Sequence, residues 1–366
     1  MIPDAVFQQT LMGFLEPVAR FLADDGVSEV MINGFEEIYI ERSGKLELTD
    51  ARFPSDHALQ SAVRNIAQYV GKTVDPERPV LDARLPDGSR VCAILPPAAR
   101  RGICVSIRRF PKERLTVAQL VKFGAITETC KQFLEVCVLV KRNVMVAGGT
   151  GSGKTSLLNA LSSFVPEAER IVVIEDSSEV RLQQPHAVYL EARPPDAKGR
   201  GAVSIRELLR ATLRMRPDRI VVGECRGGEA LDLIQAMTSG HGGSLSTVHA
   251  TYPHDTLHRL ETLCLMSDVE LPLSALRAQI ASAVNVIVQT SRMNDGSRKI
   301  THVAECLGMS ASGGYDLRML YEFKQTGVDP QTGRVLGKLT PTGELPSFVE
   351  EIAGKGLELP AEMRAR

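Results

Sequence analysis

The chain has 366 residues, of which 43% are hydrophobic and 24% are charged, with 43 Lys and Arg against 44 Asp and Glu. This length is enough for two domains with separate cores, and the near-zero net charge excludes a chain-wide surface for nucleic acid or membrane. The seven cysteines form no CxxC pair, which argues against a zinc ribbon or a disulfide framework and favours a reducing, cytoplasmic location.

The first 110 residues have the pattern of a small α+β domain. Helical patterns at about 5–23 and about 55–71 alternate with segments that have the pattern of β-strands. The strand-like segments are VSEVMIN, EEIYIERSGKLELT, LDARLPDGSRVCAILPP and GICVSIRRF. The Pro-Asp-Gly of the third stretch predicts a turn between two strands. The polar segment that follows this domain predicts a linker at 111–117.

The region 118–305 changes to an alternation of strands and helices. Its strand-like stretches are NVMVAGG, RIVVIED, RIVVGE, SLSTVHA and AVNVIVQT. This alternation predicts an α/β fold in which helices cover a parallel sheet. The turn-rich remainder, 306–366, is expected to be a small C-terminal appendage of the same domain. No apolar run approaches the roughly 20 residues that cross a bilayer, so a membrane role is expected only through a partner.

The segment GGTGSGKT fits the phosphate-loop pattern G-x-x-x-x-G-K-[ST], also called Walker A. It follows a strand and precedes the helical text SLLNALSSF, a context that disfavours a glycine-rich turn without a ligand. Its glycines let successive backbone N–H groups point at one anion. Lys154 would reach the β- and γ-phosphates of ATP, and Thr155 would bind Mg²⁺. The predicted nucleotide-binding residues are Gly148, Gly149, Thr150, Gly151, Ser152, Gly153, Lys154, Thr155 and Ser156.

Two later strands end in carboxylates. RIVVIED ends in Glu175 and Asp176, and RIVVGE ends in Glu224. Because the carboxyl ends of parallel strands share one edge of a sheet, both ends are expected near the γ-phosphate. Glu224 is predicted to activate the attacking water, and Glu175 to support Mg²⁺, partly through water. The alternative for either carboxylate is a helix cap or a solvated turn.

The segment TSGHGGSLSTVHA places His241 in a glycine-rich turn and His249 at the end of a strand. His249 is expected at the edge of the phosphate loop, where it can hydrogen-bond the γ-phosphate or Glu224 and sense the nucleotide. His241 is a second candidate sensor, with an ordinary surface histidine as the alternative. No His/Cys pair has the spacing of a zinc site.

Several arginines are candidates for arginine fingers, which stabilise transition-state charge from a neighbouring subunit. Arg108 and Arg109 close the first domain just before the linker. Another candidate lies in SIRELLRATLRMRPD, where Ser204 and Glu207 have capping-box spacing and Pro217 is expected to end the helix. A solvated charged face is the alternative for each candidate. The four candidates are Arg90, Arg108, Arg109 and Arg210.

Together these segments resemble the secretion ATPases of type II and type IV systems. The likeness is greatest to the CpaF/TadA branch, which powers the assembly of Tad (Flp) pili. It extends over most of the chain and rests on SEVMINGFEEIYIERSGKL, LDARLPDGSRV, GGTGSGKTSLLNAL, VVIEDSSEV, LEARPPD, LLRATLRMRPDRIVVGECRGGEALDLIQAMTSGHGGSLSTVHA and VLGKLTPTGELPSFVEE. In that family, the segments with Glu175, with Glu224 and with His241 and His249 are named the Asp box, Walker B motif and His box.

The resemblance implies a RecA-like P-loop ATPase domain after the smaller α+β domain, in a homohexameric ring that uses ATP and Mg²⁺. It implies a cytoplasmic protein, peripheral at the inner membrane, that acts with a membrane platform protein in pilus assembly or secretion. Glu224 would be the catalytic glutamate, assisted by Lys154, Glu175 and His249. The chain departs from the family at Gly242, where many relatives are expected to have an acidic residue. The four-cysteine metal module of type II relatives is also absent.

Three other functions compete with this interpretation. A conjugative type IV secretion ATPase shares the same motifs. A RecA-type nucleic-acid motor would need a basic channel and aromatic stacking platforms, whereas this chain is neutral and has no Trp and only six Tyr. A nucleotide-binding scaffold with little hydrolysis is disfavoured by the complete set of Lys154, Glu175 and Glu224. No nucleic-acid partner is therefore expected.

Overall fold

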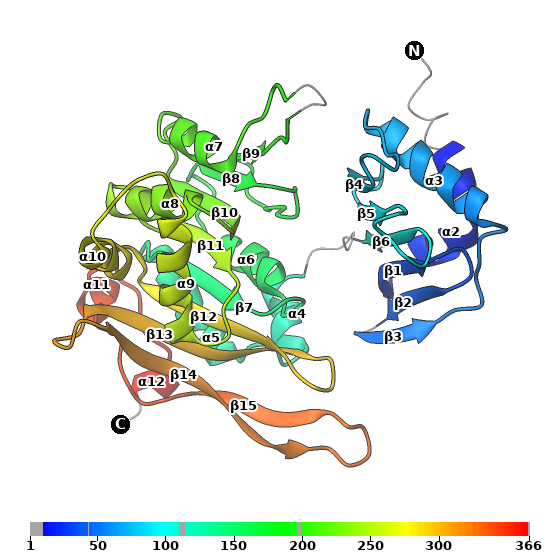
Figure 1. Ribbon diagram of the computed structural model, residues 1–366. Helices are drawn as coiled ribbons and strands as arrows, with labels where there is room; N and C mark the ends of the chain where they lie inside the picture. Colours follow the sequence, from blue (N-terminus) through cyan, green and yellow to red (C-terminus); the bar gives the residue numbers. More distant parts are fainter. Residues whose placement is uncertain (1–9, 43, 110–114, 196–198, 365–366) are drawn as a thin grey trace. The chain divides into compact units, whose positions relative to one another are not determined.

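The computed structural model describes residues 10–42, 44–109, 115–195 and 199–364. The chain divides into two compact units, Met1–Glu113 and Arg114–Arg366 (Figure 1). The first unit is built on a six-stranded sheet and the second on a nine-stranded sheet whose inner strands are parallel. This confirms the predicted fold class, an α/β domain with a parallel-rich sheet preceded by a smaller α+β domain.

The N-terminal unit is an antiparallel sheet with helices on one face. Its strand order is β3-β2-β1-β6-β5-β4. Alternate strand residues such as Val30 and Ile32 are buried under helices α2 (Glu16–Ala23) and α3 (Asp56–Tyr69), which is the period of two that a half-buried strand requires. The strands are β1 (Val27–Asn33), β2 (Ile38–Arg42), β3 (Lys45–Leu48), β4 (Val80–Arg84), β5 (Arg90–Ile94) and β6 (Cys104–Arg108).

The larger unit is a sheet of order β15-β14-β13-β12-β7-β11-β10-β8-β9. The six strands from β12 to β9 run parallel to one another, and β13, β14 and β15 are added antiparallel. The strands are β7 (Val144–Gly148), β8 (Ile171–Glu175), β9 (Ala187–Glu191), β10 (Arg219–Cys225), β11 (Leu245–Val248), β12 (Val286–Arg292), β13 (Arg298–Met309), β14 (Tyr315–Val328) and β15 (Val335–Pro341).

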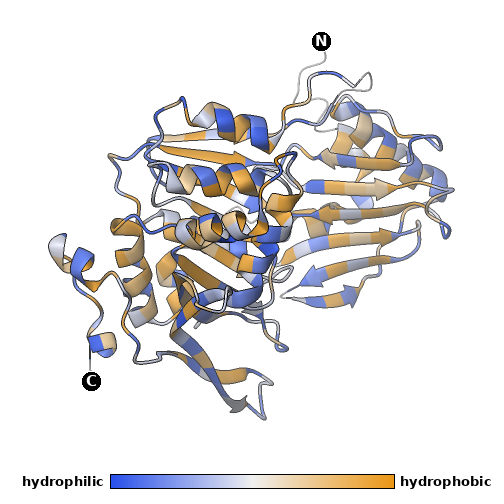
Figure 2. Cartoon of the chain, turned by 60° about the vertical axis from the view of Figure 1, so that its left-hand side comes forward, coloured by the Kyte–Doolittle hydropathy of each residue, from blue (hydrophilic) through white to orange (hydrophobic). Residues whose placement is uncertain are grey.

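Helices cover both faces of this sheet, so inner strands such as β7 and β8 are buried at every position and are mostly hydrophobic (Figure 2). Val144 and Val146 of β7 pack into one core with α4, α5 and α6, whereas Met145 and Ala147 pack into a second core with α8, α9 and α10. The helices are α4 (Val117–Lys122), α5 (Glu128–Leu139), α6 (Lys154–Ser162), α7 (Ile205–Thr212), α8 (Glu229–Thr238), α9 (Pro253–Leu265), α10 (Leu273–Ala283), α11 (Val349–Gly354) and α12 (Ala361–Arg364). Within the described ranges, no helix is long and apolar enough to cross a membrane.

The predicted linker and C-terminal appendage do not coincide with the boundaries of helices and strands in the structure. Of the predicted linker 111–117, residues 111–114 fall outside the described residues, and α4 begins at Val117 with a capping box from Thr116. The predicted boundary at 305/306 falls inside β13, and β14 and β15 continue the main sheet. The end of the chain returns to α5, where the Phe348 ring stacks on Phe133 at a centroid distance of 6.5 Å.

Helix α7 ends earlier than the sequence predicts. It stops at Thr212, five residues before Pro217, and Met215 N–H bonds back to the Thr212 carbonyl at 2.8 Å. Arg216 has a φ of 54°, in the left-handed region. A residue that precedes proline is sterically disfavoured in the right-handed helical region, so the helix must end before Arg216.

Candidate nucleotide site

The phosphate loop connects β7 to α6 at the edge where the parallel strands end. Gly151 and Gly153 have φ values of 68° and 92°, which a residue with a side chain rarely adopts. A Cβ on Gly148 would lie 2.4 Å from the hydroxyls of both Ser152 and Thr290, so only glycine fits there. The predicted loop residues therefore form one turn, and its backbone conformation depends on these glycines.

The start of α6 and Lys154 together prepare this loop for an anion. No side chain caps the first turn of α6, which contains Thr155 and Ser156. The backbone N–H groups of this turn are therefore available to donate hydrogen bonds to a phosphate. Lys154 is buried, and its Nζ donates to the carbonyls of Gly148 at 3.1 Å and Gly149 at 3.0 Å. A charged phosphate oxygen would be a stronger acceptor than either carbonyl.

Glu224 is held between two side chains next to this loop. Its Oε1 lies 2.8 Å from His249 Nε2, and its Oε2 accepts a hydrogen bond from Arg226 Nε at 2.7 Å. Arg226 Nη1 also donates to Asp176 Oδ2 at 2.5 Å. His249 Nε2 in turn lies 3.3 Å from Lys154 Nζ. The ends of β10, β11 and β8 thus bring Glu224, His249 and Asp176 into one connected group beside Lys154.

Glu175 lies at the end of β8 but is buried. Its Oε1 accepts hydrogen bonds from the N–H groups of Glu179 at 2.9 Å and Val180 at 2.8 Å. A Cβ on Gly223 would lie 2.8 Å from Glu175 Cγ, so the glycine before Glu224 makes room for this side chain. Burial raises the pKa of Glu175 to about 7, although the two N–H groups oppose that shift.

This raised pKa gives a stability prediction for Glu175→Gln. The folded chain holds a proton on Glu175 that the unfolded chain loses near pH 4.5, so the unfolding free energy of the native protein falls as pH rises from 4.5 to 7. Gln cannot ionise and keeps the acceptor oxygen. The free energy of unfolding of the variant should therefore rise relative to that of the native chain, by about 3 kcal/mol between about pH 5 and about pH 8. Urea denaturation in EDTA at several pH values measures the free energy of unfolding of both chains. If the two free energies change with pH in the same way, Glu175 ionises normally and the prediction is wrong.

The two histidines lie at opposite edges of the sheet. Burial and the nearby Lys154 lower the pKa of His249, which keeps its ring neutral at physiological pH. His241 precedes β11, and its carbonyl accepts from Ser244 Oγ at 2.8 Å, while Val144 N–H donates to the Ser244 carbonyl. Val144 begins β7, so His241 is roughly 13 Å from the phosphate loop at 3.3 Å per strand residue. Of these two histidines, His249 joins the site within one chain and His241 does not.

Two of the candidate arginine fingers are engaged in their own units. Arg109 is buried and donates to the Asp24 and Val27 carbonyls, the latter at 3.0 Å. Arg210 Nε donates to the buried Asp232 Oδ1 at 2.8 Å. Both guanidinium groups therefore have a structural use in a single chain.

The other two candidates belong to a row of arginines in the N-terminal sheet. Arg84 of β4 lies opposite Arg90 of β5, and Arg90 lies opposite Arg108 of β6, all on the face that the helices leave uncovered. Arg90 Nη2 is paired with Asp82 at 2.9 Å, and Arg108 is exposed. Carboxylates share this face, since Asp82 pairs with Arg90 and Glu29 of β1 lies opposite Arg108. The sequence analysis missed Arg84 because its place depends on strand register.

Further supporting residues come from β12, and the sequence analysis missed them. Thr290 Oγ1 donates to the Ala147 carbonyl at 3.1 Å and lies 2.8 Å from Ser152 Oγ. Gln289 Nε2 donates to the Ala250 carbonyl at 3.0 Å, beside His249. The sequence contains a signal for them, since these two polar residues directly follow the apolar stretch Val286–Val288, as Glu175 follows Ile171–Ile174.

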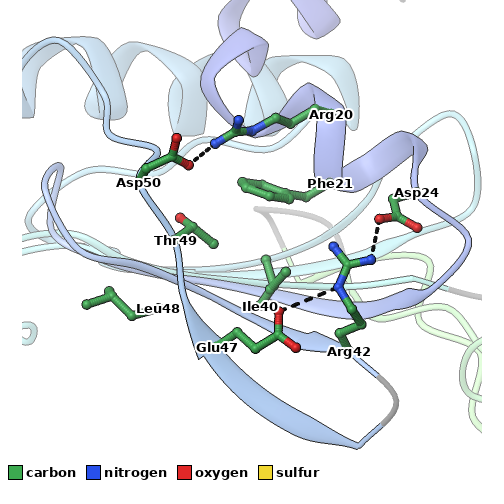
Figure 3. A pocket seen from close by; sticks show the side chains of 9 residues that line it. All are labelled: Arg20, Phe21, Asp24, Ile40, Arg42, Glu47, Leu48, Thr49 and Asp50. Atoms are coloured by element: carbon green, nitrogen blue, oxygen red, sulfur yellow. Dashed lines mark hydrogen bonds and ion pairs between the residues drawn. The ribbon is translucent and has the colours of Figure 1, made fainter.

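A hollow in the N-terminal unit is a separate feature (Figure 3). Arg20 lies over the Phe21 ring at 4.6 Å and pairs with Asp50. Arg42 pairs with Asp24 at 2.6 Å and also with a second carboxylate across the hollow. The arginines of this hollow are already paired with carboxylates in its wall, so the phosphate loop, and not this hollow, is the candidate phosphate site. It is lined by Arg20, Phe21, Asp24, Ile40, Arg42, Glu47, Leu48, Thr49 and Asp50.

Comparison with known proteins gives one matching family and several similar relatives. The sequence profile of the family "Type II/IV secretion system protein" matches residues 14–312. The type IV secretion system protein PtlH of Bordetella pertussis is 35% identical over 312 residues, which cover 78% of this chain and 91% of that protein. A putative conjugal transfer protein of Mycobacterium tuberculosis is 35% identical over 298 residues, which cover 80% and 83%. VirB11 of Bartonella quintana, a type IV secretion system protein, is 30% identical over 326 residues, which cover 79% and 91%.

Two solved structures share the fold. The ATPase DotB of Legionella pneumophila superposes with a TM-score of 0.55 at 21% identity, covering 78% of this chain and 79% of that chain. The pilus retraction motor PilT with bound ADP gives a TM-score of 0.53 at 18% identity, covering 96% and 86%. At these identities the likeness concerns the fold alone.

Proposed function

Because the chain belongs to the type II/IV secretion system protein family, we propose that it is a motor that hydrolyses ATP to power pilus assembly or protein secretion. The observation that carries this proposal is the position of Glu224 beside the phosphate loop, with one oxygen next to His249 and the other next to Arg226. A loop that only binds nucleotide has no need of a carboxylate held in this place.

The phosphate loop binds the triphosphate, and Glu224 acts on the attacking water. Lys154 exchanges its two carbonyl partners for β- and γ-phosphate oxygens. Arg226 holds Oε2 of Glu224, which leaves Oε1, 2.8 Å from His249 Nε2, to act on the water. Glu224 orients the water and accepts its proton. His249, which is neutral, can hydrogen-bond both Glu224 and the γ-phosphate, and it therefore serves as the nucleotide sensor.

The donor set around the loop fits Mg²⁺. When bound, the ion neutralises charge between the β- and γ-phosphates. Thr155, in the uncapped first turn of α6, would hold it directly. Glu175, whose Oε1 is engaged by two backbone N–H groups, would hold it through water. In the part of the chain that the structure describes, no three His, Cys, Asp or Glu side chains could hold a metal alone, which suits an ion carried mainly by phosphate oxygens.

We propose that the chains form a homohexameric ring in which arginines of the N-terminal unit serve a neighbouring subunit. Arg108 supports this role, because it is exposed on the sheet face that the helices of this unit leave uncovered. Arg109 and Arg210 instead stabilise their own units through the contacts described above. His241, at the far edge of the sheet, would need to act across a subunit contact.

The finer assignment is to the CpaF/TadA branch, as the ATPase of Tad pilus assembly. The protein would be cytoplasmic and peripheral at the inner membrane, bound there through a platform protein. A conjugative type IV secretion ATPase is the second candidate, because the M. tuberculosis relative is named for conjugal transfer. Neighbouring pilin and platform genes would favour the pilus, whereas loss of DNA transfer in a deletion strain would favour conjugation.

The experiment that tests the motor function is an ATPase assay with and without single-stranded DNA. We expect Mg²⁺-dependent hydrolysis that DNA changes by less than about twofold, since the sequence has a net charge of −1 and few aromatic residues on which bases could stack. Lys154→Ala serves as the inactive control. Strong stimulation by DNA would favour a nucleic-acid motor, and ATP binding without hydrolysis would favour a scaffold.

A further inference from the structure

The turn between β12 and β13 lies against the phosphate loop on the side away from Glu224. The sheet order places β11 and β10 on one side of β7 and β12 on the other. β12 is parallel to β7, with Thr290 opposite Gly148, so residues after β12 emerge at the edge of the phosphate loop. The loop therefore has the hydrolytic residues on one flank and this turn on the other.

Arginines at the two ends of this turn both reach the loop. Arg298 Nε donates to the Gly151 carbonyl at 3.1 Å, and its Cγ is 3.7 Å from where a Cβ on Gly153 would stand. Arg292 Nη1 is 3.5 Å from the corresponding position on Gly151. Both residues are exposed. Their guanidinium groups and stems thus form an exposed wall along the phosphate loop.

The turn itself is firmly held. Asp295 Oδ1 accepts from the N–H of Ser297 at 2.9 Å and from its hydroxyl at 2.6 Å, and Met293 N–H donates to the Ser297 carbonyl at 2.7 Å. Asp295 Oδ2 accepts from Val335 N–H at 2.7 Å. Val335 begins β15, which lies beyond the residues 14–312 that match the family. The C-terminal strands therefore fix the position of the two arginines.

The direction of the nucleotide follows from this arrangement. With the γ-phosphate beside Glu224, as the proposed function requires, the remainder of the nucleotide extends across the loop toward β12. A planar guanidinium group stacks well on an aromatic base. We propose that Arg292 and Arg298 form a nucleobase platform, on which the purine ring of a nucleoside triphosphate stacks. This inference rests on the proposed function and adds to it the site of base recognition.

The test compares ATP with inorganic tripolyphosphate, which has the phosphates but no base. Binding of each to the full chain in Mg²⁺ is measured by titration calorimetry at low temperature. For Arg292→Ala and for Arg298→Ala we expect ATP to bind about tenfold more weakly, as for loss of one stacking partner. Tripolyphosphate should bind unchanged. Asp295→Ala, which releases the turn, should give the same selective loss. Arg64→Ala, an exposed arginine on α3, is the matched control.

Each other outcome is decisive. If tripolyphosphate weakens as much as ATP, the arginines act on the phosphates or on the loop, and the platform is wrong. Unchanged ATP binding in both arginine variants also overturns it. If the unmodified chain binds neither ligand, the proposed function fails. The two failures are therefore distinguishable, because only the second affects tripolyphosphate binding by the unmodified chain.

Discussion

Glu224→Gln is expected to bind ATP as tightly as the native chain and to lose at least about 99% of its turnover, since a positioned general base contributes about 10²- to 10⁴-fold. The amide keeps the size of the side chain and can still contact Arg226 and His249, but it cannot accept a proton from water. The phosphate loop, which supplies the binding energy, is unchanged. Binding is measured by calorimetry and turnover by phosphate release.

A second carboxylate at the same sheet edge provides the control for Glu224. Glu191 ends β9, beyond β8, and is exposed. Glu191→Gln removes one negative charge from the same edge and should leave turnover within about twofold, because exposed charges act weakly at a distance. Hydrolysis at the native rate in Glu224→Gln would remove Glu224 from its role. An equal loss of turnover in both variants would show that the total negative charge at this end of the sheet matters, and not the specific position of Glu224.

Local sequence patterns predicted the phosphate loop, the nearby strand ends and the start of α7. The capping box is confirmed, since Ser204 N–H donates to Glu207 Oε2 at 2.7 Å and Glu207 N–H donates to Ser204 Oγ at 3.2 Å. Such features depend on residues a few positions apart, so a single sequence contains them. The edge strand β9, in contrast, was missed because its apolar run, Ala187–Leu190, has only four residues, and so short a run does not identify a strand by its pattern.

The rest of the site depends on contacts between distant segments. Arg226 follows Glu224 closely, but its bond to Asp176 requires β8 and β10 to be neighbours. Arg84 joins Arg90 only through the register of two strands. His241 and His249 are close in sequence, yet β11 lies between them and carries them to opposite edges of the sheet. Strand order and register are global properties, which residue types and spacing alone do not fix.

Arg108→Ala is expected to lose at least about 99% of the turnover of an assembled ring, because arginine fingers contribute about 10³- to 10⁵-fold. Mixing it with Glu224→Gln should restore activity. A subunit from Arg108→Ala retains its own Glu224 and can receive Arg108 from a Glu224→Gln neighbour. In a ring with head-to-tail contacts and random mixing, about a quarter of the sites have this combination. Phosphate release is measured before and after the two variants exchange subunits.

Two further variants separate action between subunits from a structural effect. Arg109 is buried in its own unit, so Arg109→Ala should lower the melting temperature, and mixing should not restore what it loses. Arg64→Ala, on the helix-covered side of the same unit, should behave like the native chain. If mixed Arg108→Ala and Glu224→Gln rings stay inactive although they exchange subunits, Arg108 does not serve a neighbour. If Arg108→Ala loses the same activity as a dilute monomer, its effect arises within one chain.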